Sequence, residues 1–312
     1  MRLRPPLGLA LVALPLLVAG CLHSNAAPAA DGLPATFVGR HVWTSPDRAL
    51  GGLSGIELSA DGRSVVVLSD RGYVFSGTLE RDAEGAVTGA SVGPAMALMD
   101  LRGGAMSGKL SDSEGLALRD DGGFWVSFEQ QARVMSYDRP GTRGRPGPVR
   151  PEFRRLEENG ALEALAIDPQ GRLVTLPEEP LPDETDTPVW RLEGNRWTAA
   201  FRITRDGRWK PVGADYGPDG RLYLLERAFW PPFGFQSRVR RFDPPVTATA
   251  PASPPLPGEA ILESNVGEFD NLEGLAIWSD AEGAIRLTMI ADDNFIALQR
   301  TELIDYRLPP GR

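Results

Sequence analysis

The sequence predicts an all-β protein, a β-propeller with five or six blades. One short motif recurs five times, and each copy is followed by a turn and a second β-rich run. The spacing of the copies leaves room for about four strands in each repeat, which is typical of a propeller blade. No long stretch shows helical periodicity. We count five four-stranded repeats and one extra N-terminal strand, so five and six blades both remain open.

Each copy of the motif predicts the first strand of a β-hairpin. The copies are Leu53–Leu58, Ser113–Leu118, Leu162–Ile167, Pro211–Tyr216 and Leu272–Ile277. The second strands are Val65–Leu68, Phe124–Phe128, Leu173–Leu176, Leu222–Leu225 and Ile285–Ile290. Gly-containing turns join the two strands of each pair, as hairpins require. The same step of every first strand carries Gly or Ala, which indicates an inner strand where neighbouring backbones crowd around a channel.

Further short strands complete the repeats. They are expected at Val74–Leu79, Val134–Tyr137, Val189–Leu192, Val239–Phe242 and Ala297–Leu303. Phe37–Trp43 precedes the first repeat, and we expect this strand to close the ring beside the last blade. The ring would then be held shut by both ends of the chain.

The N-terminal segment indicates export. A basic start precedes the apolar run Leu7–Ala19, which is too short for a membrane-spanning helix and suits a signal peptide. Cys21 follows small residues at the end of this run, and the arrangement resembles a bacterial lipoprotein signal. An ordinary signal peptide with a chance cysteine is the alternative. We expect a signal peptide at 1–20, an Ala/Pro-rich tether at 21–35 and a single propeller domain at 36–310.

Lipid on Cys21 would anchor the protein to a membrane of the cell envelope. The residue after Cys21 is Leu rather than Asp, which favours the outer membrane over the inner one, with the propeller facing the periplasm. We expect a monomer.

Composition excludes several function classes. The formal net charge of −9 argues against nucleic-acid binding, which needs a basic surface. The chain has one Cys, so it can form neither an intramolecular disulfide nor a Cys-based zinc cluster. Its two His residues both lie within the first 41 residues, so the main body can hold neither a Ser–His–Asp triad nor a multi-His metal site.

Hairpin symmetry gathers carboxylates at one mouth of the channel. The start of the first strand and the end of the second strand lie at the same end of every hairpin, so Glu114 is expected opposite Glu129. Ten carboxylates belong to this set: Asp70, Glu114, Glu129, Glu163, Glu178, Glu179, Glu226, Glu273, Asp292 and Asp293. Like charges at close range raise each other's pKa or recruit a cation. Salt bridges from Arg71 and Arg227 are the alternative.

Oxygen ligands favour Ca²⁺ or Mg²⁺ over softer metals. The candidate ligands are Asp70, Glu114, Glu163, Glu273 and Asp293. Glu129 is the candidate general base, and Arg71 and Arg227 are candidate phosphate-binding groups, because guanidinium forks bind phosphate in a bidentate manner. Together these residues predict a metal-assisted hydrolytic site.

The C-terminal stretch carries the most specific resemblance. Asn271–Ala276, Ile290–Phe295 and Gln299–Thr301 are similar to the closing signature of the bacterial "esterase-like activity of phytase" family. Similar blocks occur at Ser69–Gly72 and Asp112–Gly115, and the resemblance extends over about residues 37–308. It implies an exported β-propeller. Its general plan is also similar to calcium-dependent propeller hydrolases, in which carboxylate and amide ligands hold a metal on the axis.

Three functions fit these patterns. The first is a divalent-cation-dependent hydrolase acting on a small phosphomonoester or ester. The second is a non-catalytic envelope scaffold with a structural cation, and the third is a sugar lactonase. A deep cleft over the acidic mouth would favour an enzyme, whereas a flat, capped mouth would favour a scaffold.

Overall fold

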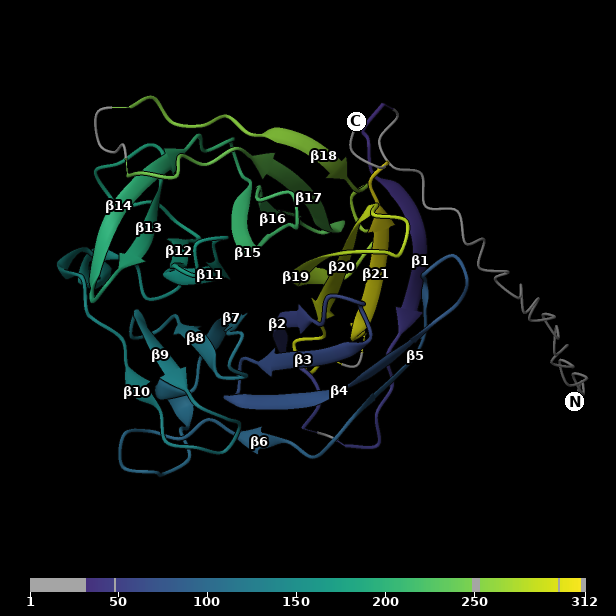
Figure 1. Cartoon of the computed structure of the whole chain (residues 1–312), viewed down its shortest axis with the longest axis horizontal. Helices are drawn as coiled ribbons and strands as arrows, with labels where there is room; N and C mark the ends of the chain where they lie inside the picture. The colour runs from purple at the N-terminus through teal and green to yellow at the C-terminus, as the bar shows by residue number, and fades with distance from the viewer. Residues whose placement is uncertain (1–31, 48, 249–252, 297, 310–312) are drawn as a thin grey trace, which may run out of the picture.

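The computed structural model describes residues 32–47, 49–248, 253–296 and 298–309, and these form a β-propeller with five sheets around a central axis (Figure 1). Blade 1 contains β2 (Leu53–Leu58), β3 (Ser64–Ser69), β4 (Tyr73–Arg81) and β5 (Val87–Val92), and β6 (Met96–Ala97) pairs with β4. Blade 2 contains β7 (Ser113–Leu118), β8 (Phe124–Phe128), β9 (Arg133–Tyr137) and β10 (Arg145–Pro146). Blade 3 contains β11 (Leu162–Ile167), β12 (Leu173–Pro177), β13 (Thr187–Glu193) and β14 (Arg196–Ile203).

Blade 4 contains β15 (Lys210–Tyr216), β16 (Leu222–Trp230), β17 (Gly234–Phe242) and β18 (Glu259–Glu263). Blade 5 contains β19 (Asn271–Ser279), β20 (Ile285–Asp292), β21 (Glu302–Arg307) and, from the other end of the chain, β1 (Thr36–Val42). Two short 3₁₀ helices, η1 (Gly108–Leu110) and η2 (Pro151–Arg155), lie between strands. No helix in the described ranges is long and apolar enough to cross a membrane.

The blade count is therefore five, and the predicted ring closure is confirmed. β1 pairs antiparallel with β21, with Arg40 opposite Ile304 and Val42 opposite Glu302. The strand expected at Ala297–Leu303 instead begins at Glu302. Just before this strand, Asp293 accepts hydrogen bonds from the Phe295 amide and the Thr301 hydroxyl. The predicted signal peptide and Cys21 lie outside the described residues.

The inner strands surround the axis in the order β2, β7, β11, β15 and β19, each in contact with the next (Figure 1). The glycines of the motif permit this approach. A Cβ on Gly115 would lie 2.7 Å from the Glu163 carbonyl oxygen, and one on Gly274 would lie 3.0 Å from the Ile56 amide nitrogen. Apolar side chains, such as those of Leu225, Leu275 and Met289, then fill the space between adjacent blades.

Every hairpin carries a β-bulge at the start of its inner strand. The register shifts fall between Leu53 and Gly55, Ser113 and Leu116, Leu162 and Ala164, Pro211 and Gly213, and Leu272 and Gly274. Each shift inserts one extra residue into the inner strand. Bulges re-aim side chains and are common beside functional sites.

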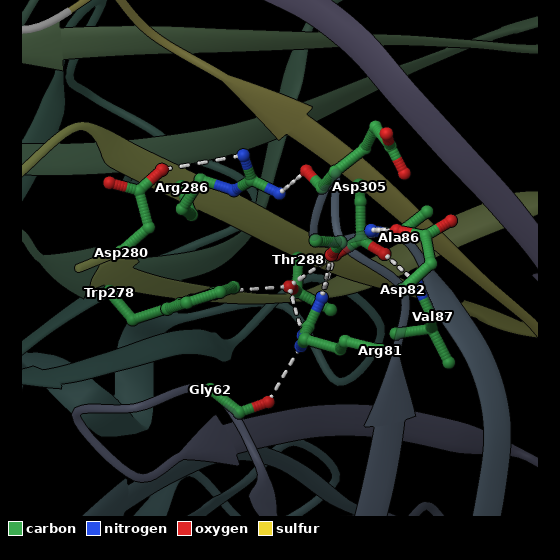
Figure 2. Close-up of polar contacts among 12 residues, drawn as sticks. Gly62, Arg81, Asp82, Ala86, Val87, Trp278, Asp280, Arg286, Thr288 and Asp305 are labelled. Carbon is green, nitrogen blue, oxygen red and sulfur yellow. Dashed lines mark hydrogen bonds and ion pairs between the residues drawn. The ribbon is translucent and has the colours of Figure 1, made fainter. Parts of the chain in front are cut away.

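A buried polar network joins blade 1 to blade 5 where the ring closes (Figure 2). Arg81 of β4 forms an ion pair with Asp305 of β21 at 2.9 Å and donates to Thr288 Oγ1 at 3.1 Å. Asp305 accepts a further hydrogen bond from the Val87 amide at 3.0 Å. The Arg81 guanidinium also stacks on the Trp278 ring, 4.5 Å from its centroid. Because Arg81 and Asp305 are almost fully buried, each depends on the other for its charge compensation.

Candidate functional site

Seven carboxyl side chains from four blades interact at one mouth of the channel, and we call them the acid cluster. They are Asp70, Asp112, Glu114, Glu129, Glu163, Glu273 and Asp292. Glu114, Glu163 and Glu273 lie at the bulges that begin β7, β11 and β19. The others lie just before an inner strand or at the end of the strand paired with it.

Burial and like charge act together on the acid cluster. Desolvation, followed by the charges of Glu273 and Glu129, raises the pKa of Glu114 well above its usual value. Glu163 is shifted in the same direction by burial and by Glu114. Burial and Glu273 raise the pKa of Asp292 to about 8, and the same causes raise that of Asp70 to about 6. Full ionisation of the cluster at neutral pH therefore needs added positive charge.

One part of the acid cluster has the geometry of a cation site. Carboxylate oxygens of Asp112, Glu114 and Glu129 all lie within 4.8 Å of one another. The Glu129 carboxyl contacts that of Glu163 by a hydrogen bond and also accepts one from the Gly160 amide at 2.5 Å. Burial raises the pKa of Glu129 to about 6. Three oxygen donors this close suit a hard divalent cation.

The opposite part of the cluster is neutralised by an arginine. Arg227 donates to Asn271 Oδ1 at 2.6 Å and to Glu178 Oε1 at 3.1 Å, and it forms an ion pair with Glu273. Burial alone would lower the pKa of Arg227, but Glu273, Glu178 and Glu163 hold it above its usual value. The mouth is thus divided into an arginine-compensated side and the side of Asp112, Glu114 and Glu129. We call the second side uncompensated because its carboxylates form no salt bridge among the described residues, although the charge of Arg133 acts on Asp112.

A cavity of about 560 Å³ opens on the arginine side. Glu178, Arg227 and Glu273 belong to its lining, so it adjoins the acid cluster directly. Arg205, Arg208 and Lys210 bring further positive charge to this lining. The mouth is therefore neither flat nor capped on this side.

Comparison with protein-family models shows which family the chain belongs to. The sequence profile described as "Esterase-like activity of phytase" matches residues 48–295. The chain belongs to this family. The match reaches all five blades, leaving out β1 and β21 of blade 5, and includes every residue of the acid cluster.

Solved structures are similar to this phytase-like chain at low sequence identity. An α-L-arabinofuranosidase from Podospora anserina, solved with cellotriose, is 13% identical with a TM-score of 0.51, over 89% of this chain and 98% of that one. An aldose sugar dehydrogenase from Streptomyces coelicolor, in its PQQ-bound form, is 14% identical with a TM-score of 0.45, over 91% and 100% of the two chains. No curated protein matches the chain. These likenesses concern the fold alone.

The phytase-like site brings together most of the residues predicted from sequence. Asp70, Glu114, Glu163 and Glu273 interact in the acid cluster with Glu129, and Arg227 lies beside them. Among these, Glu273 is engaged by Arg227 and by Asn271, which donates to it at 2.7 Å.

Two predicted residues have other contacts. Asp293 accepts hydrogen bonds from the amides of Gly52 at 3.0 Å and Phe295 at 3.1 Å, and from the Thr301 hydroxyl at 3.1 Å. Both of its oxygens are therefore already engaged by groups of the protein. Arg71 lies over the Phe295 ring, 3.2 Å from its centroid, and is exposed.

Two sequence expectations are wrong in detail. Glu114 is not opposite Glu129: the bulge shifts the register, and the Glu129 amide instead bonds to the Asp112 carbonyl at 3.1 Å. Glu226 does not join the acid cluster, because Arg240 and Arg238 bind its carboxylate at 2.6 Å and 2.9 Å inside blade 4.

Sequence reasoning also missed important groups. Asp112 was not among the ten carboxylates, although it lies directly before the second motif copy. Arg205 and Arg208 were missed because they lie between β14 and β15, and Lys210 because it precedes the motif copy that begins at Pro211. The Arg/Lys-rich character of 205–210 was the available signal.

Proposed function

We propose that this protein is a divalent-cation-dependent hydrolase of small phosphomonoesters or esters, anchored in the cell envelope through lipid on Cys21. The observation that carries the proposal is the divided mouth: the acid cluster has three uncompensated carboxylates on one side and reaches an arginine-lined cavity through Glu273 on the other. Phosphoester hydrolysis can use a cation site and an anion-binding group at one mouth. Membership of the phytase-like family supports the same class of chemistry.

The uncompensated carboxylates fit Ca²⁺ or Mg²⁺. Asp112, Glu114 and Glu129 offer only oxygen donors, and no His or Cys stands among the acid cluster. A divalent cation held there would act as a Lewis acid toward the phosphoryl or acyl group. Its charge would also lower the pKa of neighbouring carboxyls, so that Glu163 would be ionised at neutral pH.

The residues of the chain would then bind the phosphate and accept the proton. Arg227, fixed by Glu178 and Asn271, presents a pre-oriented guanidinium to a phosphate in the cavity. Glu163 contacts Glu129 on one side and feels the charge of Arg227 on the other, so it lies between the two halves of the mouth. In this position its carboxylate accepts a proton from the attacking water. The water oxygen forms a bond to phosphorus as the bond from phosphorus to the ester oxygen breaks. The leaving oxygen takes a proton from solvent, Glu163 returns its proton to solvent, and an alcohol and phosphate result.

The test separates cation binding from proton transfer. With p-nitrophenyl phosphate and p-nitrophenyl acetate as substrates, a chelator should abolish turnover and Ca²⁺ or Mg²⁺ should restore it. Glu129→Gln should raise the cation concentration needed for half-maximal rate. Glu163→Gln should lower kcat by about 10²–10⁴-fold without that rise, because it removes the base. Glu157→Gln, at an exposed acid, is the control. Chelator-resistant turnover, or none with any cation, contradicts the proposal.

The two alternative functions, a non-catalytic scaffold and a sugar lactonase, would also bind a cation. Unlike a phosphoester hydrolase, neither needs the arginines of the cavity. The open, charged cavity favours an enzyme over a scaffold, and its positive lining favours an anionic substrate over a neutral lactone.

A further inference from the structure

The cavity beside the acid cluster has a composition that the cation chemistry alone does not require. Four cationic side chains, Arg205, Arg208, Lys210 and Arg227, and two phenylalanines, Phe229 and Phe235, contribute to its lining. Only Arg227 is in contact with the acid cluster. The other three cations are therefore available to a part of the substrate away from the reacting bond.

Only some of the cationic side chains in this lining form salt bridges with carboxylates. Arg205 pairs with Glu179 at 2.7 Å, and Lys210 pairs with Glu179 at 3.0 Å and Glu178 at 3.1 Å. Arg208 has no carboxylate within salt-bridge distance among the described residues; its guanidinium is stacked on the Trp230 ring, 3.7 Å from the centroid. An exposed arginine oriented by an aromatic ring is ready to bind an anion.

The phenylalanines form an apolar wall at the same cavity. Phe229 of β16 and Phe235 of β17 are directly paired across the hairpin, and their ring centroids are 4.9 Å apart. Phe229 is 55% exposed, so its ring is not part of the core. A solvent-exposed aromatic pair gains stability when a planar apolar group covers it.

We infer that the substrate is a phosphoester of an aromatic alcohol that carries a second negative charge. The phosphate lies at Arg227, beside the acid cluster, and the aromatic ring packs on Phe229 and Phe235. Arg208 binds the second anion. This inference rests on the proposed function for the identity of the reacting group, but the binding of ring and second anion is independent of turnover.

The experiment compares three non-hydrolysable phosphonates by calorimetry in millimolar Ca²⁺: methylphosphonate, benzylphosphonate and 4-(phosphonomethyl)benzoate. Benzylphosphonate should bind more tightly than methylphosphonate. The benzoate should bind about tenfold more tightly again, the expected gain from one charge-assisted hydrogen-bonded pair. Equal affinities for the last two compounds would overturn the role of the second charge.

Variants assign each part of the selectivity to its residue. Arg208→Gln should bring the benzoate and benzylphosphonate to equal affinity, whereas Arg196→Gln, at an exposed arginine outside the cavity lining, should not. Phe229→Ala should remove the advantage of benzylphosphonate over methylphosphonate. Phe233→Ala, at the 75% exposed tip of the same hairpin and outside the lining, should preserve it.

The failure of this inference differs from the failure of the proposed function. Turnover of p-nitrophenyl phosphate together with no selectivity among the phosphonates would overturn the inference and leave the hydrolase. Selective binding that depends on Arg208, without turnover of any ester, would support the inference and overturn the hydrolase. Unchanged selectivity in both Arg208→Gln and Phe229→Ala would show that the cavity is not the binding site.

Discussion

Replacing Glu57 by Gln should stabilise the protein at neutral and alkaline pH. Glu57 lies near the end of β2, away from the acid cluster, and burial together with the charge of Asp215 raises its pKa well above the usual value. Burial also raises the pKa of Asp215 to about 7. Each carboxyl accepts a backbone hydrogen bond from a neighbouring blade, from Leu118 to Glu57 at 3.3 Å and from Ile277 to Asp215 at 2.7 Å.

The sign follows from the direction of both shifts. A carboxyl whose pKa is higher in the folded state than in the unfolded state binds its proton more tightly when the protein is folded. Its contribution to stability is fully present below about pH 4 and is lost as the pH rises through the folded-state pKa. For Asp215 the rise from 3.8 to about 7 is roughly three pKa units, or about 4 kcal/mol at full ionisation. Glu57→Gln removes the second carboxyl whose pKa is raised and leaves the desolvation of Asp215 in place. We therefore expect the variant to retain only the loss due to Asp215, at most about 4 kcal/mol, and the wild type to lose more.

The assay is urea unfolding with a chelator present, at about pH 5 and about pH 8, the range that brackets the folded pKa values. The acid cluster contributes equally to both proteins, so the difference between their pH dependences isolates Glu57. Glu157→Gln, at an exposed acid, should retain the wild-type pH dependence. If Glu57→Gln loses as much stability as the wild type between the two pH values, the coupling of Glu57 to Asp215 is refuted.

Three further outcomes are expected. Arg81→Met should lower the free energy of unfolding by about 3–5 kcal/mol, because it leaves the buried Asp305 carboxylate without its partner; denaturant unfolding measures this, and a loss under about 1 kcal/mol would contradict it. Gly213→Ala should cost about 1–3 kcal/mol by crowding an adjacent inner strand, whereas Gly93→Ala, with only ordinary contacts, should cost less in the same assay. Cys21→Ser should release the protein from the membrane fraction, and unchanged fractionation would refute lipid anchoring.

The fold was predictable because each repeat has recognisable local sequence patterns. Gly-containing turns, β-rich runs and a small residue at one step of each inner strand are all visible in the sequence, and each corresponds to a contact in the structure. Gly115, for example, faces the backbone of the next inner strand at Glu163. The blade count was left open, because five repeats and one extra N-terminal strand fit five or six blades; the pairing of β1 with β21 assigns that strand to blade 5.

The candidate site was predictable in location but not in detail. Strict hairpin symmetry cannot foresee a bulge, and the bulge at Glu114 is what moves Glu129 opposite Asp112. Whether an acid at a strand end joins the cluster also depends on which partners the adjacent strand or loop brings to its carboxylate. Arg238 and Arg240 of the adjacent strand bind the Glu226 carboxylate, and the Asp293 carboxylate accepts a hydrogen bond from the Phe295 amide.

The central claim is that the acid cluster holds a divalent cation, and the most direct test is the melting temperature of metal-stripped protein with and without Ca²⁺. In the wild type, Ca²⁺ at a hundredfold excess over its Kd should stabilise the fold by about 2.7 kcal/mol and raise the melting temperature by several degrees. Glu114→Gln should melt higher than the wild type without Ca²⁺, because it relieves like-charge repulsion, and it should gain less when Ca²⁺ is added. A wild-type melting temperature that neither Ca²⁺ nor Mg²⁺ changes would contradict the account.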